Sequence, residues 1–281
     1  MKFSICNEIF KGWKIDDVFE YVAELGYAAV EISPFTLSES VINIPQGERD
    51  RIRGISEKTG VAVAGLHWLL ASPEGLHITH YDPKVREKTK DYLMELVRFC
   101  GDIDGSVLVF GSPKQREILK QVSYADAWEY AKETFAECSE YAQERGVTIC
   151  LEPLATTFPN NFIKTPAEAV KMIEEINNPN FKLILDTFSS ASEDVDIPGA
   201  IRKYKKYLAH IHVNDDNKSW PGSGEINWGP IAEALKEIDF RGYVSTEVFV
   251  FEPNPRTIAR ESINFLKPLF QMNQGGRVRN G

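Results

Sequence analysis

Four acidic or imidazole side chains stand at the ends of four short apolar segments in the second half of the chain. They are Glu152 in VTICLE, Asp186 in KLILD, His212 in AHIHV and Glu247 in YVSTEV. Carboxylates and imidazole bind divalent metals such as Mn²⁺, Mg²⁺, Co²⁺ and Zn²⁺, and the residue types alone do not choose among these ions. Three carboxylates brought together repel one another unless a cation neutralises them. The four residues therefore predict a site for one divalent metal ion.

The alternation of side chains along these segments supports such a site. Residues two apart on a strand share a face, and the neighbours of opposite parity are apolar, as at Leu151, Leu185 and Ile211. Taken singly, each candidate ligand could be a salt-bridged core carboxylate or a hydrogen-bonded core histidine. Four of them with one inward parity favour the metal site, because unpartnered polar groups there would be strongly unfavourable. His210 has the same parity one layer deeper, so we expect it to support the ligands.

The segments that position these residues recur along the whole chain. The expected strands are residues 2–6, 28–33, 61–67, 106–111, 147–152, 182–186, 209–213 and 243–248. Between them, apolar residues recur at three- and four-residue spacing, which predicts helices. Eight such units in a row favour the α/β class and a single (β/α)₈ TIM barrel, in which the C-terminal strand ends form one active face. An open doubly wound sheet is the alternative, but no GxGxxG motif follows the first strand.

Local signals mark where the helices begin and end. Asp82 before Pro83, and Thr165 with Glu168 three residues on, are typical of helix starts. Four glycines precede expected strands, and we expect a positive φ at each of them: Gly26, Gly60, Gly146 and Gly242.

The composition favours a soluble cytoplasmic protein. We expect residues 1–272 to form the barrel and residues 273–281 to form a flexible C-terminal tail. The net charge of −9 argues against a nucleic-acid partner. No apolar stretch is long enough to cross a membrane, no signal-peptide pattern begins the chain, and the four cysteines form no CxxC pair. The sequence does not decide whether the protein forms a homo-oligomer.

Several segments resemble the xylose isomerase-like TIM barrel superfamily of sugar isomerases and epimerases. The matching pieces are GLHWLL (65–70), LEPL (151–154), LDTFS (185–189), HIHVND (210–215), PGSGEINW (221–228) and STEVF (245–249). Within this superfamily the chain is most similar to the ketose 3-epimerases. The resemblance implies a small sugar or polyol substrate and one divalent metal, held at the positions of the four candidate ligands.

The resemblance also implies that Glu152 and Glu247 are the catalytic acid/base pair. One of them removes the proton from C3 of a ketose, and the other returns a proton on the opposite face. The chemistry is sound in itself, because a metal on the C2 carbonyl and C3 hydroxyl oxygens stabilises a cis-enediolate between two such carboxylates.

Three departures from the 3-epimerase pattern bear on the substrate. The family often has Asn-Arg-aromatic-Glu after the EPL of strand five, where residues 155–158 of this chain are Ala-Thr-Thr-Phe. It often has His where Ser189 stands and Arg where Lys218 stands, and Lys cannot reproduce a bidentate guanidinium contact. We expect Ser189 and Lys218 to contact the substrate, and a different sugar, polyol or keto compound stays open.

The first half of the chain adds further candidates. His67 ends the third strand and Trp68 follows it, so we expect them to contact a sugar through a hydrogen bond and an apolar face; a structural role is the alternative for each. Glu31 points inward from strand two and is expected to hydrogen-bond His67 or another group of the barrel interior. Lys114 and Arg116 follow strand four, where a solvated charged loop is favoured over a site for an anionic substituent.

These observations favour a metal-dependent sugar isomerase or epimerase, and among such reactions they favour epimerisation of a ketose at C3. A keto-inositol dehydratase, or another sugar or polyol isomerase of the superfamily, is the first alternative. An apurinic endonuclease is less favoured, because those enzymes resemble three-metal sites built from several histidines and this chain has five histidines in all. A non-catalytic barrel would bind sugar without exchanging deuterium from solvent.

Overall fold

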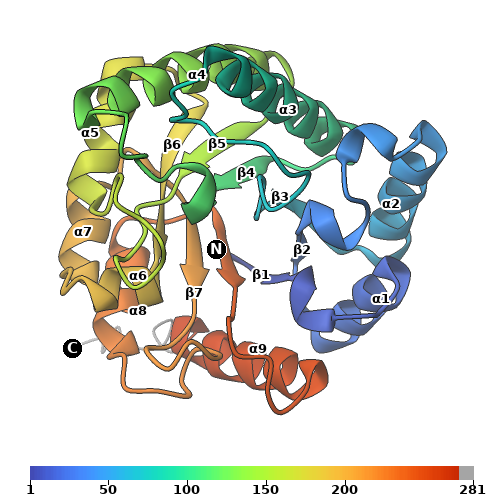
Figure 1. Ribbon diagram of the computed structural model, residues 1–281. Helices are drawn as coiled ribbons and strands as arrows, with labels where there is room; N and C mark the ends of the chain where they lie inside the picture. The colour runs from blue at the N-terminus through green and yellow to red at the C-terminus, as the bar shows by residue number, and fades with distance from the viewer. Residues whose placement is uncertain (272–281) are drawn as a thin grey trace.

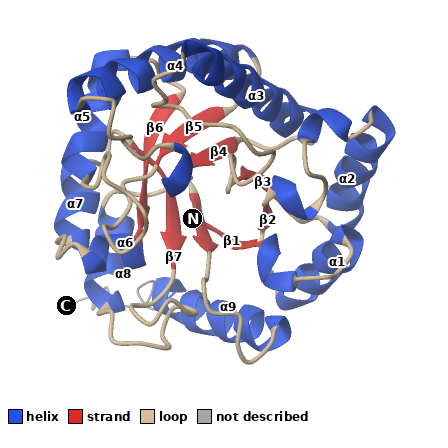
Figure 2. Ribbon diagram, in the orientation of Figure 1, coloured by secondary structure: helices blue, strands red, loops and turns tan. Residues whose placement is uncertain are grey.

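Eight parallel strands close into a barrel, and the helices surround it on the outside (Figures 1 and 2). This is a computed structural model, and it describes residues 1–271. The strands are β1 (Lys2–Cys6), β2 (Ala29–Ile32), β3 (Ala62–Leu66), β4 (Val107–Phe110), β5 (Thr148–Leu151), β6 (Phe181–Asp186), β7 (Leu208–Val213) and β8 (Tyr243–Thr246). The predicted TIM barrel is confirmed. The predicted tail, residues 273–281, lies outside the described residues.

Amphipathic helices connect the strands and cover the outer face of the barrel. They are α1 (Ile15–Leu25), α2 (Gln46–Thr59), α3 (Pro83–Asp102), α4 (Tyr124–Glu144), α5 (Pro166–Ile176), α6 (Thr187–Ser192), α7 (Ile197–Lys203), α8 (Trp228–Glu237) and α9 (Pro255–Gln271). Short 3-10 helices lie in the loops at η1 (Asn7–Phe10), η2 (Pro34–Thr36), η3 (Val41–Asn43) and η4 (Pro113–Gln115). None of the helices within residues 1–271 combines the length and apolar character needed to span a bilayer.

The predicted helix caps are present. The Asp82 side chain accepts a hydrogen bond from the backbone of Lys84 at the start of α3. Thr165 and Glu168 form a reciprocal capping box at the start of α5. These bonds satisfy backbone N–H groups that the helices leave unpaired.

The glycine prediction holds at three of the four positions. Gly26, Gly60 and Gly146 have positive φ values. Gly242 does not have a positive φ, so the prediction there is wrong; a Cβ atom at this position would lie 2.3 Å from the backbone oxygen of Ala209. Close approach of two backbones, rather than a left-handed turn, requires glycine before β8.

The strand register brings the polar strand ends to one mouth of the barrel. Asp186 pairs with His212 across β6 and β7, and His212 pairs with Ser245 across β7 and β8. β5 and β8 end one residue before Glu152 and Glu247, earlier than expected. A small buried apolar cluster lies on the same inward face as the candidate ligands, deeper in the barrel: Val107, Val109, Cys150 and Ile184. The ligand positions therefore rest on a packed interior.

Candidate active site

The structure brings the four candidate metal ligands together at the C-terminal mouth of the barrel. One donor atom from each of them lies within 4.8 Å of the donor atoms of the other three: Glu152, Asp186, His212 and Glu247. None of these residues is more than 6% exposed. Three carboxylates and an imidazole this close together can hold one divalent metal ion.

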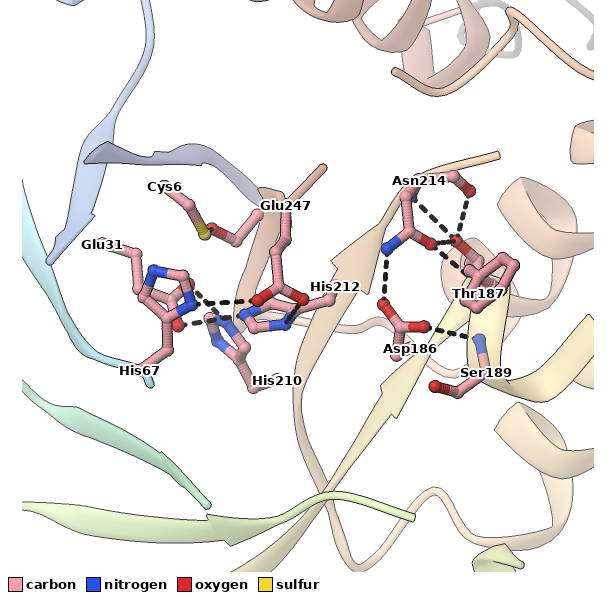
Figure 3. A network of polar contacts seen from close by, with 12 residues as sticks. Cys6, Glu31, His67, Asp186, Thr187, Ser189, His210, His212, Asn214 and Glu247 are labelled. Carbon is pink, nitrogen blue, oxygen red and sulfur yellow. Dashed lines mark hydrogen bonds and ion pairs between the residues drawn. The ribbon is translucent and has the colours of Figure 1, made fainter. Parts of the chain in front are cut away.

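Asp186 is oriented by the first turn of α6 and by the loop after β7 (Figure 3). Its Oδ1 accepts the backbone N–H of Ser189 at 2.6 Å, and its Oδ2 accepts an amide N–H of Asn214 at 2.7 Å. The hydroxyl of Thr187 in turn donates to Asn214. Such outer hydrogen bonds fix the direction of a ligating carboxylate. Asn214 was not predicted, although it lies within the HIHVND segment.

His212 lies between two carboxylates. Its Nδ1 is 3.0 Å from Oε2 of Glu247, and its Nε2 is 3.0 Å from Oε1 of Glu31. The other oxygen of Glu31 is 2.9 Å from Nε2 of His210. A metal-binding histidine usually has its second ring nitrogen bonded to such a carboxylate. Glu31 and His210 therefore lie where supporting residues were expected, and of the two alternatives for Glu31 the partners are the histidines of β7, not His67.

Glu152 places its carboxylate against the end of β4. A Cβ atom at Gly111 would stand 2.3 Å from Oε2 of Glu152, closer than side chains tolerate. Gly111 therefore provides the space that the carboxylate occupies, a close approach that the sequence pattern did not indicate.

Arg116 is fully buried behind Glu152, so the expectation of a solvated loop is wrong at this residue. Its guanidinium donates to the backbone oxygen of Glu152 at 2.7 Å, and also to Ile163 and Asn160. A buried cation is costly without such partners, and burial lowers the pKa of Arg116 to about 10. Arg116 thereby fastens loop 152–163 to the end of β4, whereas Lys114 is exposed as expected.

The electrostatics of the cluster fit a cation. Burial, with the charge of Glu247, raises the pKa of Glu152 to about 8 and that of Asp186 to about 6. Burial also disfavours charge on Glu247, but His212 and His67 outweigh it and hold its pKa at about 2. The histidines thus compensate the charge of Glu247, whereas the charges of Glu152 and Asp186 remain unfavourable. A divalent ion among the four donors would relieve this repulsion.

His67 links the ligand set to the loops after β1 and β2. Its Nδ1 is 3.1 Å from Oε1 of Glu247, and its Nε2 is 2.9 Å from Oε2 of Glu8. The hydroxyl of Ser33 contacts both His67 and Glu8. Glu8 was not predicted, because it lies in η1, where strand parity no longer applies.

A pocket opens over the candidate ligands. Two of the ligands, the residues that follow β3 and two aromatic rings line it: Glu152, Glu247, His67, Trp68, Phe158 and Phe249. His67 and Trp68 thus occupy positions from which they can contact a substrate, as expected. Trp68 has a φ of 53°, a left-handed conformation that is unusual for a bulky side chain and is concentrated at functional sites.

The other two expected substrate contacts do not line this pocket. Ser189 is buried and uses its backbone to hold Asp186. Lys218 places its ammonium group 5.0 Å from the ring centroid of Phe188 and 5.7 Å from that of Phe158. Neither residue lines the pocket, so direct substrate contact by either one stays a prediction.

The sequence matches the family model of the xylose isomerase-like TIM barrel over residues 19–269, and the chain belongs to this family. Its relatives include the D-psicose 3-epimerase of Ruminiclostridium cellulolyticum, which is 30% identical over 247 residues, 85% of this chain and 80% of that protein. A probable ketose 3-epimerase of Synechocystis is 24% identical over 281 residues, 91% of each chain. The relatives are epimerases, and the chain is an enzyme of the isomerase class.

Solved structures with the same fold include two sugar epimerases. A D-psicose 3-epimerase crystallised in the presence of D-fructose has a TM-score of 0.84 and 21% identity, covering 96% of this chain and 99% of that chain. The 3-keto-D-glucoside 4-epimerase of Escherichia coli has a TM-score of 0.82 and 19% identity, covering 94% and 98%. At these identities the likeness concerns the fold.

Proposed function

We propose that this enzyme is a divalent-metal-dependent epimerase that inverts a ketose at C3. The observation that carries the proposal is the gathering of three carboxylates and one imidazole within 4.8 Å, with two of the carboxylates lining a pocket. The D-psicose and ketose 3-epimerases among the relatives support the choice of substrate and carbon.

The four donors would hold the metal from positions that neighbouring residues fix. Asn214 and the Ser189 backbone orient Asp186, and Glu31 orients His212. A bound divalent ion supplies Lewis-acid polarisation of the sugar carbonyl, which makes the adjacent C–H proton easier to remove. Mn²⁺, Mg²⁺, Co²⁺ and Zn²⁺ all suit this donor set.

Glu152 and Glu247 are the residues proposed to move the proton. Both line the pocket, so both carboxylates would face a sugar bound there. They reach it from β5 and β8, and their surroundings differ, since Glu247 is held by His67 and His212 whereas Glu152 lies in the space left by Gly111. One carboxylate takes the proton from C3, and the other, as the acid, returns one to the opposite face.

Proton exchange in D₂O tests this proposal. Mn²⁺-loaded protein is incubated with D-fructose, D-psicose and D-tagatose, and deuterium at C3 is followed by NMR. We expect deuterium at C3 together with the C3 epimer, and loss of both after chelation. Glu152→Gln and Glu247→Gln should each lower the rate on the order of 10²–10⁴-fold, the usual contribution of an acid or base.

The matched control is Glu237→Gln, an exposed glutamate of α8 that pairs with Arg202 and should leave exchange unchanged. The metal content of each variant is measured in parallel, so that loss of proton transfer is separated from loss of the ion. Full exchange by either site variant would remove that glutamate from the acid/base role. Loss of one water from a keto-inositol, without exchange of ketoses, would favour the dehydratase instead.

A further inference from the structure

A second hollow lies beside the pocket over the ligands. It is formed by the loops after β1, β2, β3 and β8 and has a volume of about 1130 Å³, open to solvent. Trp68 lines both the pocket and this hollow, so one indole ring forms the boundary between them. The other aromatic rings of the hollow come from three loops: Phe10 and Trp13 from the loop after β1, Phe35 from the loop after β2 and Phe251 from the loop after β8.

One mostly buried carboxylate lies at the edge of this hollow. Glu8 lines it and is only 8% exposed. Its Oε2 is bonded to Ser33 and His67, but within residues 1–271 its Oε1 has no hydrogen-bond partner. An unpaired buried acceptor is costly. The oxygen has a free acceptor position but is covered, so it can accept a ligand hydroxyl once the side chain turns toward the hollow.

Two rings of the aromatic lining are exposed to solvent. Phe35 is 42% exposed and Phe251 is 45% exposed. Exposed apolar side chains gathered at a hollow are typical of a binding site, in which a few polar groups fix the orientation of the ligand. The indole N–H of Trp68 likewise has no partner within the described residues. Flat apolar faces with one acceptor and one donor suit a ring that carries hydroxyl groups.

The size of the first pocket limits what it can hold. It is much smaller than the hollow beside it. A sugar larger than one ring must therefore extend beyond it. A third hollow also borders Trp68 and Phe158, but its lining includes Glu74, Gly75 and Lys114 rather than a set of aromatic faces.

We propose that the substrate is a ketose that carries a second ring through a glycosidic oxygen at the end away from its carbonyl group. The ketose occupies the pocket beside Glu152 and Glu247. The second ring lies in the hollow against Trp68 and Phe251, with a hydroxyl donated to Glu8. This inference rests on the proposed function for the position of the reacting sugar.

Binding of ketose disaccharides to the Mn²⁺-loaded full chain tests the inference. The probes are D-fructose, lactulose and isomaltulose, since both disaccharides keep C3 of their fructose unit free. By isothermal titration calorimetry, we expect at least one disaccharide to bind about tenfold or more tightly than fructose. Saturation-transfer NMR should place the second ring, and not only the fructose unit, in contact with protein. The disaccharide that binds shows whether the second ring is attached at C4 or C6.

Two exposed phenylalanines provide variants that leave the ligand set intact. The double variant Phe35→Ala/Phe251→Ala should weaken disaccharide binding about tenfold and leave fructose binding unchanged. Lys114→Ala, in the third hollow, is the control and should change neither. Equal affinity for all three sugars, or disaccharide binding that depends on Lys114 instead of the phenylalanines, would overturn the inference.

The two proposals fail in different ways. If fructose exchanges deuterium at C3 but disaccharides gain no affinity, the epimerase proposal stands and the second-ring site is removed. If no ketose exchanges deuterium while disaccharide binding still depends on Phe35 and Phe251, the hollow is a sugar site and the C3 epimerase proposal is wrong. A glycoside-specific enzyme should also exchange C3 of the bound disaccharide faster than that of fructose.

Discussion

The two halves of the barrel mouth contribute to the candidate site in different ways. The four candidate ligands lie at or next to the ends of β5–β8, and their donor atoms lie within 4.8 Å of one another. The segments around β1–β3 instead supply Glu8, Glu31 and His67, which contact His212 and Glu247 or each other. Figure 3 shows the same division, with Asp186 held by its own half and His212 and Glu247 held from across the barrel.

This difference suggests that one half of the barrel binds the metal and the other half orients the residues that bind it. If the second half binds the ion, changes there should remove binding. If the first half orients the ligands and shapes the entrance, changes there should weaken the site without abolishing it. Variants in each half therefore test the division.

The largest effect is expected from Asp186→Asn in the ligand half. The amide keeps the shape of the side chain but removes one negative donor, so Mn²⁺ affinity should fall on the order of 100-fold or more, beyond the 10–100-fold typical of supporting residues. Titration calorimetry measures it. Asp239→Asn, at an exposed residue paired with Arg241, is the control. Unchanged affinity for Mn²⁺ would remove Asp186 from the ligand set.

Gly111→Ala lies at the junction of the two halves and should displace the Glu152 carboxylate, because the new Cβ would stand 2.3 Å from Oε2. A shift of about 1 Å can cost about 100-fold in rate, so we expect a loss of this order in deuterium exchange. Gly54→Ala is the control, since nothing lies within 4 Å of a Cβ there. In α2 it should raise stability by about 0.5–1 kcal/mol. Full activity of Gly111→Ala would contradict the placement of Glu152.

Glu31→Gln tests the orienting half. The amide keeps only part of the hydrogen bonding to His210 and His212 and removes the charge behind the ligand. Mn²⁺ affinity should fall about 10–100-fold, as for other carboxylates behind a histidine ligand. Glu20→Gln, at an exposed residue paired with Lys58, should have no effect. A loss as large as that of Asp186→Asn would erase the distinction between the halves.

Arg116→Lys should give the smallest effect on chemistry and a measurable effect on stability. Lysine cannot reproduce the forked donation to Glu152, Asn160 and Ile163, so the free energy of unfolding should fall by about 1–3 kcal/mol. Urea denaturation of the metal-free protein measures it. Arg202→Lys, at an exposed pair with Glu237, should change it by less than about 0.5 kcal/mol. Equal stabilities of the two variants would show that loop 152–163 does not depend on Arg116.

The sequence was most informative where periodic structure controls the side chains. The eight strands and the inward parity of Asp186 and His212 follow from alternation, which tertiary packing preserves. Glu8 and Arg116 could not be assigned in this way, because they lie in loops whose paths depend on contacts far away in sequence. The error at Gly242 has the same origin, since the oxygen of Ala209 that requires glycine belongs to another strand.

His67 shows how far strand alternation can predict a site residue. Parity placed His67 on the inner face, but its bonds to Glu8 and Glu247 depend on how η1 closes over β1. The expected substrate contacts of Lys218 and Ser189 rest on the family resemblance alone, and neither residue lines the pocket. Loop geometry, rather than strand order, decides which side chains face a ligand.

The position of the metal can be measured directly by anomalous X-ray diffraction from Mn²⁺-soaked crystals. Two other groups of donors lie close enough to compete for an ion: Cys6, Glu31, His67 and His212, and Glu8, His67 and Glu247. We predict one anomalous peak, bonded to Glu152, Asp186, His212 and Glu247. A peak in either competing group, or no peak with the protein saturated in Mn²⁺, would contradict the proposed metal centre.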